Sequence, residues 1–202
     1  MARPALHDPS AIIDATLRLA ATGMEAVTIA GIGRAAGVPS GSIYHRFDSR
    51  DGLLAAAWLT AMRGFQSGFL TGLQDEAGPP GLAAAVHTTD WARTQPHRAR
   101  ALVLHRADDF GAARWPGERR EEARRLAGQL EDGLAEFSLR HLGGMGGEVR
   151  RRVTFALLDL PFAAVRRYLA AGLPPPPEVD QYLEQALGAV LAPARDHGSS
   201  AK

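Results

Sequence analysis

Residues 28–47 read TIAGIGRAAGVPSGSIYHRF, a pattern that predicts two short helices joined at Gly37. The hydroxyl of Thr28 can cap the first helix by accepting one of its unpaired first-turn N–H groups. Gly37 can adopt a positive φ and so turn the chain sharply. Pro39 suits the first position of the second helix, where its missing N–H is not needed. The stretch therefore predicts a helix-turn-helix unit.

The second of these helices has one apolar side and one polar side. Ile43 and Phe47 lie four positions apart and are expected to bury the same side against the core. The remaining positions fall on or near the outer side: Ser40, Gly41, Ser42, Tyr44, His45 and Arg46. A short helix with an anchored face and a small, hydrogen-bonding outer face suits the major groove of DNA.

The run GVPSGSIYHRFDSRDGLL over residues 37–54 resembles the DNA-binding signature of the TetR family of bacterial transcriptional regulators. The resemblance extends over about residues 10–58 and includes the order and spacing of the flanking helices. The first helix of the motif departs from the family pattern at Gly31 and Gly33. Each glycine costs about 0.5–1 kcal/mol relative to alanine inside a helix, so this helix depends on packing.

The resemblance implies an all-α protein of two parts. Residues 1–50 would form an N-terminal three-helix helix-turn-helix DNA-binding domain, and residues 51–192 a larger helical ligand-binding and dimerisation domain. Apolar residues follow helical spacing along the chain, with no strand pattern and no internal repeat. Residues 193–202 are small and polar, and we expect a disordered tail there.

The composition limits the function classes. The chain has 202 residues with 23 Lys+Arg against 22 Asp+Glu, so the overall charge does not indicate nucleic-acid binding. Attraction to phosphate has to come from the placement of Arg34, Arg46 and Arg50 and from helix N-termini. The absence of cysteine excludes disulfides and thiolate sites. We see neither a signal-peptide pattern nor ~20 consecutive apolar residues, and expect a cytoplasmic protein without membrane contact.

Two C-terminal helices, near 148–171 and 178–192, present more apolar surface than one chain can cover. The first is apolar nearly all round its middle, where we expect Pro161 to kink it. Pairing both helices with their two-fold copies would build a four-helix bundle and a homodimer through about residues 148–192. The alternative is that these helices cap the core of a monomer.

Helix geometry and the resemblance together imply roles on double-stranded DNA. The residues expected to contact it are Thr28, Arg34, Ser40, Gly41, Ser42, Tyr44, His45, Arg46 and Arg50. Thr28 at a helix N-terminus and Arg50 in the first turn of the fourth helix would hold phosphates. Ser40 and Ser42 would make direct or water-mediated base contacts. A homodimer would place two such helices about one DNA turn apart and read a palindromic operator.

Three neighbouring residues complete this surface. Gly41 would let the recognition helix lie close to the groove wall. Tyr44 and His45 match family positions that hold phosphates or flank the bases. For Tyr44 the alternative is a core aromatic with only its hydroxyl exposed.

The larger domain is expected to bind a small-molecule effector, as the resemblance implies. Candidate lining residues are Met62, Phe65, His87, Trp91, His105, Phe110, Phe155 and Asp159. This mostly aromatic and aliphatic set favours a lipophilic, partly polar ligand. The alternative for Asp159 is a carboxylate that pairs with an arginine or caps a backbone break at Pro161. The protein would then be a ligand-responsive regulator, a repressor that the effector releases, and neither an enzyme nor a cofactor protein.

Two other functions stay open at this point. One is a DNA-binding architectural or activator protein without an effector. The other is a helical metal-dependent hydrolase in which His105, Asp108 and Asp109, with His87 and Asp90, hold a metal.

Overall fold

The structure is a computed structural model that describes residues 8–192. The expected tail at 193–202 lies outside the described residues. Within the described part the chain forms helices, turns and no strand, which confirms the all-α prediction. No helix among these residues combines the length and the apolar character that a membrane crossing requires.

Three short helices form the N-terminal part. They are α1 (Pro9–Ala20), α2 (Ile29–Ala36) and α3 (Ser40–Phe47), with a 3₁₀ turn, η1 (Met24–Ala26), after α1. The Asp8 carboxylate caps α1 by accepting from the N–H of Ser10 at 3.0 Å. The three helices share one core. Each of them contributes at least one completely buried side chain to it: Ile12, Leu17, Ile32 and Ile43.

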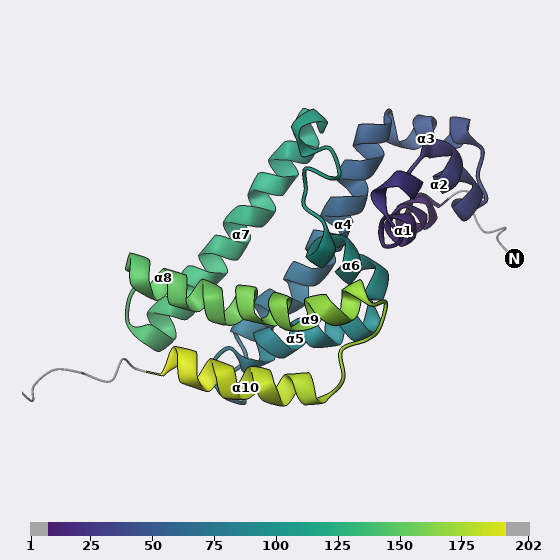
Figure 1. The fold of residues 1–202 in the computed structure, drawn as a ribbon. Coiled ribbons are helices and arrows are strands. Elements are labelled where there is room, and N and C mark those ends of the chain that lie inside the picture. Colours follow the sequence, from purple (N-terminus) through teal and green to yellow (C-terminus); the bar gives the residue numbers. More distant parts are fainter. Residues whose placement is uncertain (1–7, 193–202) are drawn as a thin grey trace, which may run out of the picture.

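Helix α4 (Arg50–Leu73) joins the two parts of the molecule. Its N-terminus is capped by the Ser49 hydroxyl, which accepts from the N–H of Gly52 at 2.9 Å. Figure 1 shows α4 leaving the group of α1, α2 and α3 and running into the larger group of helices. One rigid helix therefore has its first turn beside α3 and its last turns in the other domain.

The larger part surrounds the second half of α4. Its helices before the C-terminal pair are α5 (Leu82–Thr94), α6 (Pro96–Leu104) and α7 (Gly117–Leu142), with a 3₁₀ turn, η2 (Ala112–Arg114), between the last two. Phe65 and Phe69 of α4 are buried in this core. In Figure 1, α7 extends along one side of the molecule and packs on α4.

The C-terminal helices follow the predicted ranges. They are α8 (Gly147–Thr154), a π-helical turn η3 (Phe155–Asp159), α9 (Leu160–Ala170) and α10 (Glu178–Leu191). The disturbance expected from Pro161 appears as this π-helical turn, since proline cannot donate a backbone hydrogen bond.

The helix from α8 to α9 is buried on one side only within a single chain. Val153, Leu157 and Val165 are inaccessible to solvent, whereas Phe155 is 49% exposed and Asp159 is also exposed. The expectation of burial on both sides is therefore not met by one chain alone. Among residues 8–192, no side chain covers Phe155 completely.

Candidate nucleic-acid interface

The unit of α2, its turn and α3 has the predicted geometry. The Thr28 hydroxyl accepts from the N–H of Gly31 at 3.0 Å, which caps α2 and leaves the hydroxyl hydrogen free to donate. Gly37 ends α2 with φ 69° and ψ 32°, the left-handed conformation that glycine adopts without strain. The N–H of Val38 then donates to the carbonyl of Gly33 at 2.9 Å, which fixes the direction in which the chain enters α3.

Close packing requires two of the glycines of α2, Gly31 and Gly33. A Cβ atom on Gly33 would lie 2.8 Å from the carbonyl oxygen of Val38, and one on Gly31 would lie 2.8 Å from that of Ala26. Both distances are shorter than real Cβ contacts allow, so larger residues would push α2 away from its neighbours. The departure of α2 from good helix formers therefore has a physical reason.

Helix α3 is anchored through one face, as predicted. Ile43 is fully buried and Phe47 nearly so. Among the predicted DNA-contacting residues on this helix, Ser42 is half-buried and the others are exposed: Ser40, Gly41, Tyr44, His45 and Arg46. Tyr44 is 49% exposed, which contradicts its placement as a core aromatic.

Gly41 differs from Gly33 in having open space around it. Apart from its own helix backbone and its two chain neighbours, no atom of residues 8–192 lies within 4 Å of the position that its Cβ would take, and its backbone is ordinary α-helix. Nothing inside the described chain requires glycine there, although glycine weakens a helix. The first turn of α3 therefore offers bare backbone to whatever approaches from outside.

Three arginines lie on or next to α3: Arg34 on α2, Arg46 on α3 and Arg50 on α4. Arg34, in the last turn of α2, and Arg46 are exposed and form no ion pair within residues 8–192. Arg50 is half-buried, and its Nη2 donates to the carbonyl oxygen of Val27 at 3.1 Å. Arg50 thus ties the first turn of α4 to the residue before the Thr28 cap, a role that the sequence did not indicate.

The residues predicted to line an effector pocket lie in three places. Phe65 of α4 packs against His87 and Trp91 of α5, with ring centroids 5.4 Å and 5.2 Å away, and against Phe162 of α9 at 5.2 Å. Met62 is half-buried one turn before Phe65. Phe65 and Trp91 are buried, so these rings form packed core.

His87 is half-buried in this cluster over Gly68, where a Cβ atom would lie 2.1 Å from the imidazole Cε1. Its Nε2 donates to the carbonyl oxygen of Phe65 at 2.9 Å. Burial lowers the pKa of His87 and outweighs the opposing effects of this hydrogen bond and of Asp90.

The remaining residues predicted to line an effector pocket lie in two other places. The rings of His105 and Phe110 are 6.3 Å apart, and Nε2 of His105 donates to the carbonyl of Ala20 at the end of α1. Phe155 and Asp159 line a groove of about 840 Å³ between α7 and α8. The eight predicted residues therefore do not gather around one shared pocket: most of the aromatic ones pack in the core, and Phe155 lines a separate groove.

The residues of the hydrolase alternative do not assemble either. His105 bonds to Ala20 and His87 to Phe65 through Nε2. The Oδ2 of Asp109 lies 3.9 Å from Nδ1 of His105 and accepts from the N–H of Arg106. Among residues 8–192, no group of three or more His, Asp or Glu side chains is arranged to hold a metal ion.

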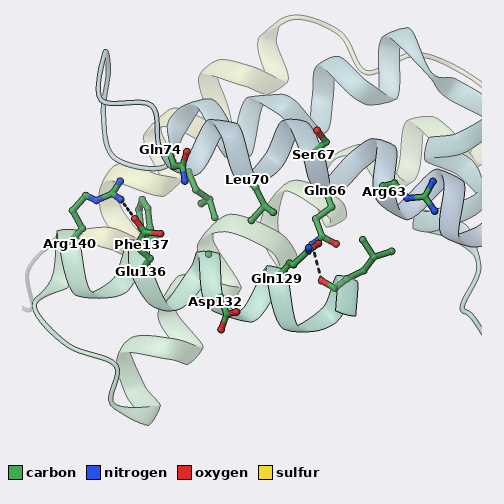
Figure 2. A pocket seen from close by; sticks show the side chains of 13 residues that line it. Arg63, Gln66, Ser67, Leu70, Gln74, Gln129, Asp132, Glu136, Phe137 and Arg140 are labelled. Carbon is green, nitrogen blue, oxygen red and sulfur yellow. Dashed lines mark hydrogen bonds and ion pairs between the residues drawn. The ribbon is translucent and has the colours of Figure 1, made fainter. Parts of the chain in front are cut away.

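A second groove, of about 520 Å³, lies between α4 and α7. Figure 2 shows its polar lining, which includes Gln66 and Ser67 on α4 and Gln129 and Asp132 on α7. None of these residues was a candidate from the sequence. The one available signal was Gln66, a polar residue directly beside the apolar stripe of α4.

The comparisons with known proteins agree with this architecture. Residues 12–57 match a family model described as bacterial regulatory proteins, tetR family. No curated protein sequence matches the chain. Among solved structures, a tetR family transcription regulator from Shewanella sp. PV-4 has a TM-score of 0.65 and 18% identity, with 91% of this chain and 95% of that chain covered.

Two further similar structures are regulators named FadR. The fatty acid degradation regulator FadR from Bacillus halodurans has a TM-score of 0.66 and 15% identity, with 93% of this chain and 100% of that chain covered. FadR from Bacillus subtilis, in complex with stearoyl-CoA, has a TM-score of 0.62 and 15% identity, with 92% and 98% covered. At these identities the likeness establishes the fold.

Proposed function

We propose that this chain, whose residues 12–57 match the family model of bacterial regulatory proteins, tetR family, is a transcriptional repressor that a small molecule releases from its operator. The observation that carries the DNA-binding part is the exposed face of α3. Its backbone is bare at Gly41, its side chains are short hydrogen-bonding groups at Ser40 and Ser42, and it lies beside the exposed Arg34 and Arg46, which form no ion pair within residues 8–192. Such a surface can enter the major groove and bind phosphates on either side.

The cytoplasm of a bacterial cell, where the chromosome lies, is the compartment that this proposal requires. Arg34 and Arg46 would hold the backbone, while the half-buried Arg50 would both hold a phosphate and keep α4 against the Thr28 cap. The domains would be those predicted from the sequence, residues 1–50 for DNA and residues 51–192 for the effector and dimerisation.

We propose a homodimer formed through α8, α9 and α10. Apolar side chains face outward on this part of the chain, among them Phe155 of η3, which is 49% exposed, and Tyr182 of α10, which is 61% exposed. Leu158, also of η3, is half-buried. A second copy related by two-fold symmetry would cover this surface and bring a second α3 to the DNA.

The two domains are joined by polar contacts in addition to α4. Arg100 donates from Nε to the carbonyl of Ala21 at 2.9 Å, beside the bond from His105 to Ala20. Inside the effector domain, next to the boundary, the Arg114 guanidinium pairs with Asp51 in the first turn of α4 at 3.1 Å. A ligand that shifts α4 or α6 would therefore move α1 and, with it, the recognition helix. Release follows if the ligand prefers the shifted state.

A titration with DNA tests this function. Operator sequences are selected from random duplexes, and the affinity of the chain for the selected duplex is compared with its affinity for a scrambled one of equal length. We expect a preference of about a thousandfold or more at one fixed salt concentration. Equal affinity for the two duplexes would reject sequence-specific regulation.

A further inference from the structure

Helix α6 lies between α9 and α1 and contacts both. Figure 1 shows α6 next to α1 on one side and next to α9 on the other, and α6 packs against each of them. Helix α9 belongs to the surface proposed for the dimer, whereas α1 belongs to the DNA-binding part. These contacts therefore connect the two surfaces by a path that does not run along α4.

The end of α6 is bonded to α9 by an arginine. The guanidinium of Arg166 on α9 donates from Nη1 to the carbonyl oxygen of Val103, in the last turn of α6. The last four carbonyls of a helix have no partner within it, and a cation near this end also interacts favourably with the helix dipole. Arg166 therefore supplies a hydrogen bond that α6 cannot make for itself, and it fixes the end of α6 against α9.

A second contact between α9 and α6 lies six residues further along the chain. Gly172 follows the end of α9 with φ 75°, and a Cβ atom on it would lie 3.3 Å from Nη1 of Arg100 on α6, closer than most real Cβ contacts. The Arg100 guanidinium therefore lies against the end of α9. Its Nε donates to the carbonyl oxygen of Ala21, directly after α1, at 2.9 Å. One side chain of α6 thus contacts the ends of both neighbouring helices.

The C-terminal end of α6 also holds the end of α1. Nε2 of His105, the residue directly after α6, donates to the carbonyl oxygen of Ala20 at 3.1 Å. His105 is only two positions after Val103, which accepts from Arg166. The bond from α9 and the bond to α1 therefore meet at the same end of α6, and a displacement of this end would displace the end of α1 with it.

We propose that Arg166 is a positioning residue for DNA binding. Its bond to Val103 sets the position of α6, and α6 sets the orientation of α1 and of the recognition helix α3, which shares a core with α1. The separation of the two copies of α3 in a dimer then depends on α9 as well as on α4. The proposal rests on the proposed function as a DNA-binding dimer and adds to it a residue of α9 that acts on the recognition helix through α6.

The orientation of the DNA-binding part is measured without DNA, from the distance between two spin labels in one chain. The sequence contains no cysteine, so Ala35→Cys on α2 and Ala127→Cys on α7, both at exposed positions, provide the only labelling sites. Labelled chains are diluted with unlabelled chains, so that each labelled dimer carries one labelled copy. We expect one narrow distance distribution in the parent and a broader or shifted one when Arg166→Ala is added.

Two further variants are matched controls. A lysine can also donate to the carbonyl of Val103, so Arg166→Lys should restore most of the parent distribution. Arg167 is the next residue on α9, is also exposed, and places its guanidinium on Tyr168 of the same helix. Arg167→Ala therefore removes the same charge without touching α6, and its distribution should match that of the parent. The melting temperature of each variant shows that it is folded.

The spacing of the operator half-sites provides a second readout, which a loss of stability alone would not change. The selected operator is compared with one whose half-sites are one base pair further apart. We expect the parent and Arg167→Ala to prefer the selected spacing by about tenfold or more. Arg166→Ala should lose most of this preference, because its DNA-binding domains are held less firmly.

Two results would overturn the proposal. One is a distance distribution in Arg166→Ala equal to that in Arg167→Ala, and the other is an unchanged spacing preference in Arg166→Ala when the chain binds its operator. Either result rejects the positioning role alone and leaves the repressor standing. A parent chain that binds no operator rejects the repressor instead, and the label distances then still decide whether Arg166 orients the N-terminal part.

Discussion

Nη2 of Arg98 on α6 lies 2.8 Å from Oδ1 of Asp14 on α1, an ion pair that joins the effector domain to the DNA-binding domain. The two side chains are 31% and 40% exposed. Partly exposed pairs of this kind contribute about 0.2–1 kcal/mol. The pair therefore orients α1 against α6 without dominating the stability of the fold.

A double-mutant cycle tests this assignment. Arg98→Ala, Asp14→Ala and the double variant are unfolded in urea, and we expect a coupling free energy below about 1 kcal/mol. A coupling above about 2 kcal/mol would mean that the pair is a principal support of the interface between the domains.

Gly33 and Gly41 should respond in opposite ways to substitution by alanine. Gly33→Ala should lower the free energy of unfolding by about 1–3 kcal/mol, because its Cβ would collide with the carbonyl of Val38. Gly41→Ala should raise it by about 0.5–1 kcal/mol, since alanine is the better helix former and the space is open.

The effect of Gly41→Ala on DNA binding should have the opposite sign to its effect on stability. If α3 lies against the groove wall, the added methyl group displaces it and weakens operator binding about tenfold. Chemical denaturation and an operator titration on the same preparation measure the two quantities. A more stable variant with undiminished operator affinity would show that the first turn of α3 does not approach DNA closely.

Arg34 and Arg50 should be distinguishable by salt dependence and stability together. In a dimer each alanine substitution removes two phosphate contacts, so the slope of log affinity against log salt should fall by about two for either variant. Arg50→Ala should also lower the stability of the N-terminal domain, because Arg50 bonds to the carbonyl of Val27. Arg34 is exposed and has no such bond in the described chain, so Arg34→Ala is the matched control. An unchanged slope in both variants would remove these arginines from the interface.

His87 should make the stability depend on pH. Burial lowers the pKa of His87 in the folded state, so below about pH 6.5 the unfolded chain binds more protons than the folded chain. Its contribution to stability is present above that pH and is lost as the pH falls. His87→Gln should therefore flatten the decline in the free energy of unfolding on acidification, and His97→Gln, at an exposed position, should leave it as in the parent chain. Equal pH profiles for His87→Gln and the parent would contradict this assignment.

The proposed dimer surface is tested by placing a charge on α10. Tyr182→Glu should convert the dimer to a monomer, because a carboxylate would be buried without a partner. Leu139→Glu, at an exposed apolar position on α7 outside residues 148–192, should remain dimeric. Light scattering gives the molar mass of each variant. A parent chain that is monomeric at micromolar concentration would contradict the interface.

The sequence was sufficient for the local structure of the DNA-binding part, because that part depends on short-range signals. The caps at Asp8, Thr28 and Ser49 and the left-handed turn at Gly37 are encoded within a few residues each. Helical spacing alone does not decide whether Tyr44 packs inside or is exposed.

The effector region was much less predictable, because it depends on how distant helices meet. An aromatic residue in a helical stripe can line a cavity or fill it, and Phe65 and Trp91 fill theirs. Oε1 of Gln66 is buried without a hydrogen-bond partner among residues 8–192 only because α7 comes to lie across α4 and supplies a single partner, to Nε2. Nor could the sequence indicate that Arg50 bonds to Val27, 23 residues earlier in the chain.

The central claim is that two copies of α3 read DNA together, and selection of bound duplexes from a random pool tests it most directly. The account predicts a palindromic motif whose half-sites are centred about one helical turn apart or a little more, roughly 34–36 Å or slightly beyond. Changing Ser42 to alanine should alter the preferred bases within each half-site without changing their spacing. Recovery of no enriched motif, or of a single unrepeated half-site, would contradict it.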